Sequence, residues 1–325
     1  MNDDELDRLI ALRGDRLTLR DLVDAGLDDL PRPGSGGTLA RWRRLAAVAA
    51  HDLSLVKLFE GHTDALAIQA ELGAAPPAAG SRWGTWCAEP PQARLRFEAD
   101  GAHYRLHGTK AWCSGAAQLT HALVSGWDGD GQPCLAAVAL DAPGVTITDS
   151  GWAAVGMRET ASVDVRFDGV PAHPVGAPGD YTARPGFWQG GAGIAACWWG
   201  GARAIAGTAR TAILGRGEPH ALAHLGAIDV AVATSATMLR ACAAWIDAHP
   251  GASARTWALR TRLAVEAAAE STMQHAGRAL GAGPLCRDAR FARAMADLPV
   301  FLRQSHAERD LASLAEPDTD AAWTL

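Results

Sequence analysis

The periodicity of apolar residues changes twice along this chain of 325 residues, and the resulting order of segments limits the folds open to it. Apolar residues follow helical spacing over residues 1–80, alternate with a period of two over 81–178, and return to helical spacing over 179–315. The sequence therefore predicts an α+β multidomain protein. It has an N-terminal helical domain, a middle β-domain and a C-terminal helical domain with those boundaries, followed by a flexible tail at 316–325.

The middle segment consists of short alternating runs separated by turn dipeptides at regular spacing. Residues 94–108 are predicted to form a hairpin with its turn at Asp100-Gly101, a pair that favours the tight type I′ turn. Two further strands are expected at residues 122–127 and 162–167. This pattern is typical of a small β-barrel or sandwich of seven or eight strands.

The C-terminal segment contains four long stretches with apolar stripes, which predict an antiparallel four-helix bundle. Gly281 is placed as the residue that follows the third helix. The pair Gly200-Gly201 lies in the first helix and allows a close approach of helix axes. The four predicted helices cover residues 192–214, 220–248, 254–280 and 289–314.

Composition excludes several classes of partner. The net charge of −6 and the lack of a basic block argue against nucleic acid or an anionic membrane as the main partner. No stretch of roughly 18 uncharged apolar residues predicts a membrane span. The six cysteines are scattered singly, without metal-ligand spacing, and the N-terminus lacks a signal-peptide pattern. We expect reduced thiols, no metal site and a cytoplasmic location.

The residues from His107 to Gln118 carry the most distinctive side chains of the β-domain. They continue the predicted hairpin and then place a bulky aromatic residue before two small residues with heteroatoms: Trp112, Cys113 and Ser114. Gly115 then breaks the run. From the residues alone, two interpretations are open: a piece of core followed by a turn, or a site at the edge of the sheet.

Three segments, in this order, resemble signature segments of the acyl-CoA dehydrogenase family, and the resemblance covers roughly residues 45–314. W-C-A-E-P (86–90) is similar to the family's x-x-T-E-P. Y-R-L-H-G-T-K-A-W-C-S-G-A (104–116) resembles its x-L-N-G-x-K-x-W-I-T-N-G. G-M-R-E-T-A-S-V-D-V-R-F-D-G-V-P (156–171) resembles the run that ends its β-domain. The resemblance implies the domain order already predicted.

The resemblance implies FAD as the cofactor, with Trp112, Cys113 and Ser114 beside the flavin ring. Ser114 is the residue expected to contact flavin N5. A hydroxyl or backbone N–H near N5 stabilises the negative charge that builds as a hydride arrives, and an indole covers a ring edge and excludes water. The family's motifs for the pyrophosphate and adenine are altered here. Arg216, Arg278 and Gly281 are the residues expected to hold phosphate.

The general base of the family is a glutamate, and its usual positions contain no glutamate in this sequence. One falls near Ser305 or His306, and the other falls within residues 186–199, which contain no carboxylate. His306 and Glu308 remain as candidate bases. The other interpretation of these two residues is a solvated helix end. His62, on an N-terminal helix, is expected to be a buried, hydrogen-bonded histidine rather than a catalytic residue.

The leading hypothesis is α,β-dehydrogenation of an acyl-CoA or other acyl thioester, with hydride transfer to FAD N5 and an electron-acceptor flavoprotein as partner. A second hypothesis is a flavin monooxygenase on the same fold, which takes reduced flavin from a partner reductase and uses a C-terminal histidine such as His306. A third is a non-catalytic subunit paired with an active paralogue. The resemblance implies a homo-oligomer, a dimer or tetramer, and a hetero-oligomer with a paralogue stays open.

Overall fold

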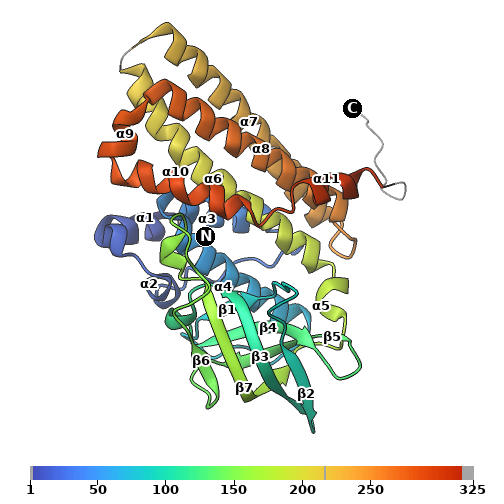
Figure 1. Ribbon diagram of the computed structural model, residues 1–325. Coiled ribbons are helices and arrows are strands. Elements are labelled where there is room, and N and C mark those ends of the chain that lie inside the picture. Colours follow the sequence, from blue (N-terminus) through green and yellow to red (C-terminus); the bar gives the residue numbers. More distant parts are fainter. Residues whose placement is uncertain (1–2, 216, 317–325) are drawn as a thin grey trace. The chain divides into compact units, whose positions relative to one another are not determined.

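The computed structural model of this chain describes residues 3–215 and 217–316 (Figure 1). The chain divides into two compact units, which are described one at a time. The first unit is made of the residues up to Leu30, Lys57–Ala154 and Arg158–Phe187. The second is made of Pro31–Val56, Val155–Met157 and the residues from Trp188 onward. The three-domain division of the sequence stays a prediction.

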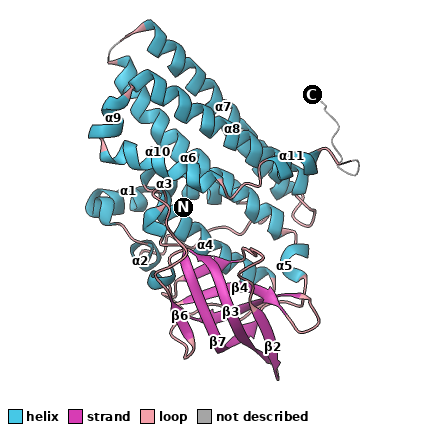
Figure 2. Cartoon of the chain, in the orientation of Figure 1, coloured by secondary structure: helices cyan, strands magenta, loops and turns pink. Residues whose placement is uncertain are grey.

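The first unit combines one sheet with short N-terminal helices and most of helix α4 (Leu53–Glu71). Strands are magenta in Figure 2, and helices are cyan. The helices are α1 (Asp3–Arg13), η1 (Gly14–Arg16), α2 (Leu19–Asp24), η2 (Ala116–Gln118), η3 (Arg158–Thr160) and α5 (Asp180–Ala183). The strands are β1 (Trp83–Trp86), β2 (Arg96–Asp100), β3 (His103–Cys113), β4 (His121–Trp127), β5 (Pro133–Ala139), β6 (Val145–Ile147) and β7 (Val163–Pro174).

The sheet of the first unit has seven strands in the order β1-β4-β2-β3-β7-β5, with β6 beside β7 and a further pairing of β4 with β5. These pairings link β2, β3, β7, β5 and β4 in a circuit. Two of these pairings are short, because β2 pairs with β4 through one residue pair and β5 pairs with β7 through two residue pairs. The mixed α+β architecture with a sheet is confirmed, and closure into a barrel stays a prediction.

The hairpin predicted at residues 94–108 is confirmed as β2 and β3, which pair antiparallel from Arg96↔His107 to Asp100↔His103. Its turn differs from the prediction. The two central residues are Gly101 and Ala102, and only Gly101 has a positive φ, of 62°. A type I′ turn needs a positive φ at both central residues, whereas type II′ needs it only at the first. The turn therefore follows the II′ pattern.

Helix α4 covers one face of the sheet, and this contact forms a core of the first unit. Ala65 and Ile68 of α4 are buried against Trp83 of β1, and the same cluster contains Leu123, Leu135 and Val175. Burying an aliphatic side chain of this size contributes about 1.5–3 kcal/mol. Residues 57–64 of α4, which precede this core in the first unit, therefore have a fixed position beside the sheet.

The second unit is helical. Its helices are α3 (Thr38–His51), α6 (Gly186–Leu214, from Trp188 onward), α7 (Pro219–Ala248), α8 (Arg255–Leu280), α9 (Ala282–Arg287), α10 (Ala289–Leu302) and α11 (Glu308–Leu314). Gly200 confirms the predicted close approach, because a Cβ there would collide with the carbonyl oxygen of Ala46 in α3. Gly281 follows α8 as expected, with φ 65°.

The last predicted helix, 289–314, is broken in the structure. Helix α10 ends at Leu302 and α11 begins at Glu308, so residues 303–307 form a separate segment. Two features hold this segment out of the helix. The Arg262 guanidinium donates to the Gln304 carbonyl at 2.8 Å, and Ala307 adopts a left-handed φ of 44°. Tertiary contacts thus override a continuous helical pattern.

Helix α7 presents an unusually apolar surface. By length and composition alone it is the one helix of residues 3–215 and 217–316 that is long enough and apolar enough to cross a membrane, although the sequence predicts no span. Only 17% of its most apolar window is buried. The charged residues Asp229 and Arg240 lie within this apolar helix, and Leu222 and Val230 are exposed on it. Length and composition do not distinguish a membrane-spanning helix from a helix whose apolar surface is covered by another protein chain.

Candidate functional site

The C-terminal end of β3 carries Trp112 in a strained conformation. The register of β3 against β7 shifts between Lys110 and Cys113, which marks a bulge in the strand. Within it Trp112 has φ 58°, a left-handed conformation that costs a non-glycine residue about 1–2 kcal/mol. Its indole is 50% exposed, while Ala111 and Cys113 on either side are buried. The bulge therefore aims one large aromatic side chain out of the sheet.

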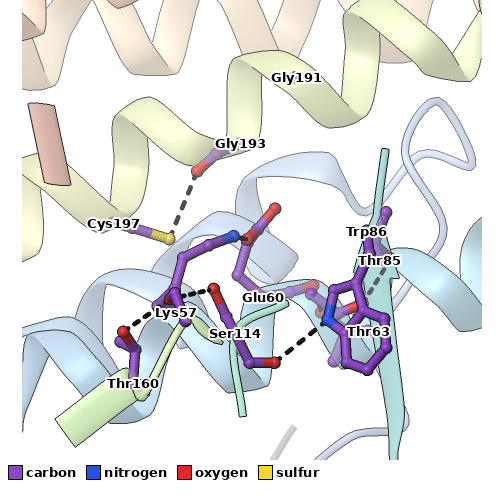
Figure 3. Close-up of polar contacts among 12 residues, drawn as sticks. Lys57, Glu60, Thr63, Thr85, Trp86, Ser114, Thr160, Gly191, Gly193 and Cys197 are labelled. Carbon is purple, nitrogen blue, oxygen red and sulfur yellow. Dashed lines mark hydrogen bonds and ion pairs between the residues drawn. The ribbon is translucent and has the colours of Figure 1, made fainter. Parts of the chain in front are cut away.

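Ser114 follows directly and begins a series of three hydroxyl groups (Figure 3). Its Oγ lies 2.7 Å from Ser162 Oγ, and Ser162 Oγ lies 2.8 Å from Thr160 Oγ1. Ser162 and Thr160 are buried, whereas Ser114 is half-buried. This chain of hydroxyls places the polar group predicted for flavin N5 at the outer end of a buried polar network.

The two segments that carry the hydroxyls are joined through their backbones. The Gly115 N–H donates to the Thr160 carbonyl at 2.7 Å, and Gly115 has φ 72°. Ala161 also has a left-handed φ, of 39°. Two strained non-glycine residues, Trp112 and Ala161, thus flank the same three hydroxyls. Strain at such a place is typical of a functional site.

Groups from α4 and β1 surround Ser114 in the first unit (Figure 3). The Trp86 indole donates from Nε1 to the Ser114 carbonyl at 3.2 Å. On α4, Lys57 Nζ donates to Glu60 Oε2 at 2.9 Å, and both side chains are largely buried. A Cβ on Gly115 would lie 2.8 Å from the Leu58 side chain, so α4 passes close to the turn. A charged pair therefore lies beside the hydroxyl chain.

A buried ion pair that includes Lys110 of β3 was missed by sequence reasoning. Lys110, fully buried in β3, donates from Nζ to Glu89 Oε1 at 2.5 Å and to Ser125 Oγ at 2.9 Å. The Ser125 hydroxyl and, at 3.1 Å, the Trp127 indole also donate to the Glu89 carboxylate. Glu89 and Lys110 belong to two different segments of the family resemblance. Their pairing depends on the sheet register, which local sequence does not reveal.

Cys113, the middle residue of the predicted flavin triplet, points into the core. Its Sγ donates to the Lys110 carbonyl at 3.2 Å, and the side chain is fully buried. Burial raises the pKa of the Cys113 thiol far above its ordinary value, against the opposing attraction of Lys110. The thiol is therefore protonated and unreactive at neutral pH. A flavin contact of Cys113 stays a prediction.

The candidate bases lie in the second unit, on the segment that interrupts the last helix. His306 is exposed, and its Nδ1 lies 3.4 Å from Asp310 Oδ1. Asp310 Oδ2 also accepts the His306 backbone N–H at 3.2 Å. Glu308 is exposed at the first residue of α11. Asp310 was missed as a partner of His306, although its spacing of four residues was visible in H-A-E-R-D.

Arg262 of α8 fixes the segment that carries His306. Its guanidinium donates to the Gly191 carbonyl of α6 and to the Gln304 carbonyl, both at 2.8 Å. It also lies 4.9 Å from the centre of the Trp198 ring, within cation–π range. Next to it, Arg303 donates to Glu266 at 2.7 Å. The position of His306 in the second unit is thus set by α8.

Of the three residues predicted to hold phosphate, the structure describes two. Arg216 lies outside the described residues. Arg278 is exposed near the end of α8, and Gly281 is exposed directly after that helix. Their role in phosphate binding stays a prediction.

His62 is a buried, hydrogen-bonded histidine, as the sequence predicts. The Trp83 backbone N–H donates to its Nδ1 at 3.1 Å, so Nδ1 is unprotonated. The proton of the ring is therefore on Nε2, which lies 3.1 Å from Asp28 Oδ2. His62 ties α4 to β1 and to the N-terminal segment.

Solved structures that share this fold include proteins with bound FMN. A nitrososynthase from Micromonospora carbonacea var. africana aligns with a TM-score of 0.79 and 21% identity, over 96% of this chain and 94% of that chain. The dibenzothiophene monooxygenase TdsC from Paenibacillus sp. A11-2 aligns with a TM-score of 0.78 and 20% identity, over 91% and 88%. TdsC has also been solved with FMN bound. The likeness fits the predicted acyl-CoA dehydrogenase-like fold, of which the closed barrel stays a prediction.

One curated relative shares a shorter segment with higher identity. The amino sugar nitrososynthase DnmZ of Streptomyces peucetius is 43% identical over 94 residues, which cover 26% of this chain and 23% of that protein. The match thus spans less than a quarter of that relative's length. No protein-family model matches the chain.

Proposed function

We propose that this chain is a flavin-dependent monooxygenase with the acyl-CoA dehydrogenase fold. The observation that carries the proposal is the turn at the end of β3. There a strained Trp112 is half exposed beside Ser114, whose hydroxyl continues into a buried chain. A flat aromatic group beside a directed hydroxyl fits the edge of an isoalloxazine ring. The similarity to TdsC and to the two nitrososynthases supports oxygenation over dehydrogenation.

Trp112 and Ser114 would hold the ring, and FMN is the proposed flavin in place of the FAD predicted from the sequence. Because FMN has no adenine half, its binding does not require the adenine-side motifs that are altered here, nor a contact from the exposed Arg278. A bound flavin supplies two-electron redox chemistry and, when reduced, reactivity toward oxygen. A partner reductase would supply the reduced form.

The proposed oxygenation balances in electrons and atoms. A bound reduced flavin would supply two electrons, which with two protons would reduce one atom of O₂ to water. The other oxygen atom would be transferred to a lone pair of the substrate, with oxidised flavin as the second product. The substrates named for the similar proteins, dibenzothiophene and an amino sugar, carry a sulfur or an amino nitrogen. The proposed substrate class is therefore a small molecule with a nucleophilic nitrogen or sulfur.

Dehydrogenation of an acyl thioester is the second candidate, and the two positions where the resemblance expects its glutamate base contain no glutamate. That reaction needs a carboxylate free to remove an α-proton. Among the described residues 303–314, Glu308 is exposed and Asp310 contacts His306 through both oxygens. Within the described first half of α6, residues 186–199 contain no carboxylate. His306 is the proposed proton-transfer residue for oxygenation.

The test has two arms. The protein with oxidised FMN or FAD is mixed with acyl-CoA thioesters without oxygen, and no bleaching of the flavin is expected; bleaching would establish the dehydrogenase. The protein with reduced FMN is then mixed with ¹⁸O₂ and a panel of amines, amino sugar nucleotides and thioethers. A product heavier by one ¹⁸O atom supports the proposal. A protein that binds no flavin in any state would favour the non-catalytic subunit.

A further inference from the structure

The hydroxyl series Ser114–Ser162–Thr160 contains two hydroxyls more than a single flavin contact needs. Its oxygen atoms are separated by 2.7 and 2.8 Å, and the two inner hydroxyls are 4% and 1% exposed. Each hydroxyl can donate one hydrogen bond and accept two. The middle hydroxyl has one proton for two neighbours, so when it donates to one neighbour it accepts from the other, and the three O–H groups then point the same way.

The backbone around the inner hydroxyls is built to bring them together. Thr160 and Ser162 are two residues apart, and Ala161 between them adopts φ 39°. The Val163 N–H closes a tight turn on the Ala161 carbonyl at 2.7 Å, and Gly115 N–H binds the Thr160 carbonyl. Ala161 thus holds a strained conformation, although an ordinary conformation would cost less. We therefore interpret the strain at Ala161 as serving the placement of the Thr160 and Ser162 hydroxyls rather than the packing of side chains.

The two possible directions of the chain correspond to two partners of Ser114. If Thr160 donates to Ser162 and Ser162 donates to Ser114, the Ser114 proton is directed outward to an acceptor. If Ser114 donates to Ser162 and Ser162 donates to Thr160, the Ser114 lone pairs face outward to a donor. Flavin N5 is an acceptor in the oxidised ring and an N–H donor in the reduced ring.

We propose that Ser162 is a positioning residue that lets Ser114 hydrogen-bond flavin N5 in both redox states, by reversal of all three O–H groups. The inference rests on the proposed function, because it takes Ser114 as the N5 contact. It adds a specific role for two buried residues that touch no flavin themselves. An enzyme that receives reduced flavin and releases oxidised flavin needs to hold both states.

Removal of the Ser162 hydroxyl affects the two states unequally. With oxidised flavin, Ser114 still donates to N5 and loses only a bond that it accepted. With reduced flavin, Ser114 accepts from N5–H, and its own proton is left without the inward partner. A bound ring would cover the half-buried Ser114, and a covered donor without an acceptor weakens binding. Reduced flavin should therefore lose more affinity than oxidised flavin.

The test measures dissociation constants of oxidised FMN and of anaerobically reduced FMN for the wild type and for Ser162→Ala. We expect Ser162→Ala to weaken reduced FMN about tenfold more than oxidised FMN, since 1.36 kcal/mol is a factor of ten. The reduction potential of bound FMN should fall by about 30 mV, the tenfold equivalent for a two-electron couple. Thr160→Val should shift the ratio in the same direction, and Thr160→Ser should restore it.

Ser150→Ala is the matched control, because Ser150 is exposed and its hydroxyl pairs with Thr148 at 3.0 Å outside the chain of hydroxyls. It should leave both constants unchanged. Thermal unfolding checks that each variant is folded, and Thr160→Val serves if Ser162→Ala is not. Equal weakening of both states, or a larger loss for oxidised FMN, would overturn the inference while leaving the proposed function intact. A wild type that binds neither state would overturn both.

Discussion

At the scale of single residues, strain is concentrated where the chemistry is proposed. Of the four described non-glycine residues with positive φ, Trp112 and Ala161 flank the hydroxyl chain, and Ala307 follows His306. The sequence predicted Ser114 because the triplet resembles a family motif. It did not predict Ser162, which is 48 residues away and meets Ser114 only through the bulged register of β3 and β7.

Ala161→Gly tests the strain directly. Glycine adopts a positive φ without the steric penalty of a Cβ, so the variant should raise the free energy of unfolding by about 0.5–1 kcal/mol. Ala142→Gly is the control, because Ala142 lies in a turn and lacks a positive φ. That change should lower the free energy of unfolding. Urea denaturation measures both, and a destabilised Ala161→Gly would show that the site carries no strain.

His121 gives the first unit a predicted dependence on pH. Burial lowers its pKa below the ordinary 6.5, against the opposing attraction of Asp141, and its ring stacks on Trp83 with centroids 4.7 Å apart. Because the folded-state pKa is depressed, the unfolded chain takes up a proton first as pH falls. The stabilisation is present above pH 6.5 and is lost as pH falls through the folded-state value.

The measurement is urea denaturation at about pH 7.5 and about pH 5.5, on either side of the ordinary histidine pKa. His121→Gln should lose less stability between these pH values than the wild type. Thr120→Val removes the hydroxyl that lies 2.9 Å from His121 Nδ1 and keeps the imidazole, so it should keep the wild-type loss. An unchanged loss in His121→Gln would refute the assignment.

At the scale of elements, periodicity predicted most helices and the β2–β3 hairpin, because amphipathic spacing is a local property of the sequence. It failed at residues 303–307, where Arg262 from α8 binds the Gln304 carbonyl and the chain leaves the helix. It also missed the Glu89–Lys110 pair, which links the segment after β1 to β3 and β4. Contacts between distant segments were thus the part that the sequence could not supply.

The Glu89–Lys110 pair is predicted to be a major support of the sheet. Lys110→Met leaves the Glu89 carboxylate without its cation in a largely buried position, and the cost should be about 3–5 kcal/mol of unfolding free energy. Arg105→Met, on the same strand, removes an exposed ion pair with Asp100 and should cost under about 1 kcal/mol. Adding Glu89→Gln to Lys110→Met should recover part of the loss. Equal costs for the two single variants would contradict this role of the pair.

At the scale of the whole molecule, the exposed apolar residues of α7 predict self-association. Leu222 and Val230 are 41% and 65% exposed on a long, apolar helix. Apolar faces of this kind are covered in oligomers, and homo-oligomers are usually symmetric. The charged residues Asp229 and Arg240 within α7 favour a protein surface over a membrane span.

Val230→Lys should therefore weaken the oligomer, because it introduces a charge into the covered face. Leu12→Lys is the control, since Leu12 is 72% exposed on α1, away from that helix in sequence. Sedimentation velocity over a range of concentrations measures the oligomeric state. A wild type that is monomeric at all concentrations, or a Val230→Lys variant that associates like the wild type, would contradict the prediction.

The most direct test of a flavin site built around Ser114 is the reoxidation of reduced FMN in the presence of the protein. Reduced FMN and protein are combined without oxygen and mixed rapidly with aerated buffer, and flavin absorbance is followed in time. We expect a reoxidation rate that changes saturably with protein concentration, with a weaker apparent affinity in Ser114→Ala. Reoxidation at the rate of free FMN at every protein concentration would contradict a flavin site at this position.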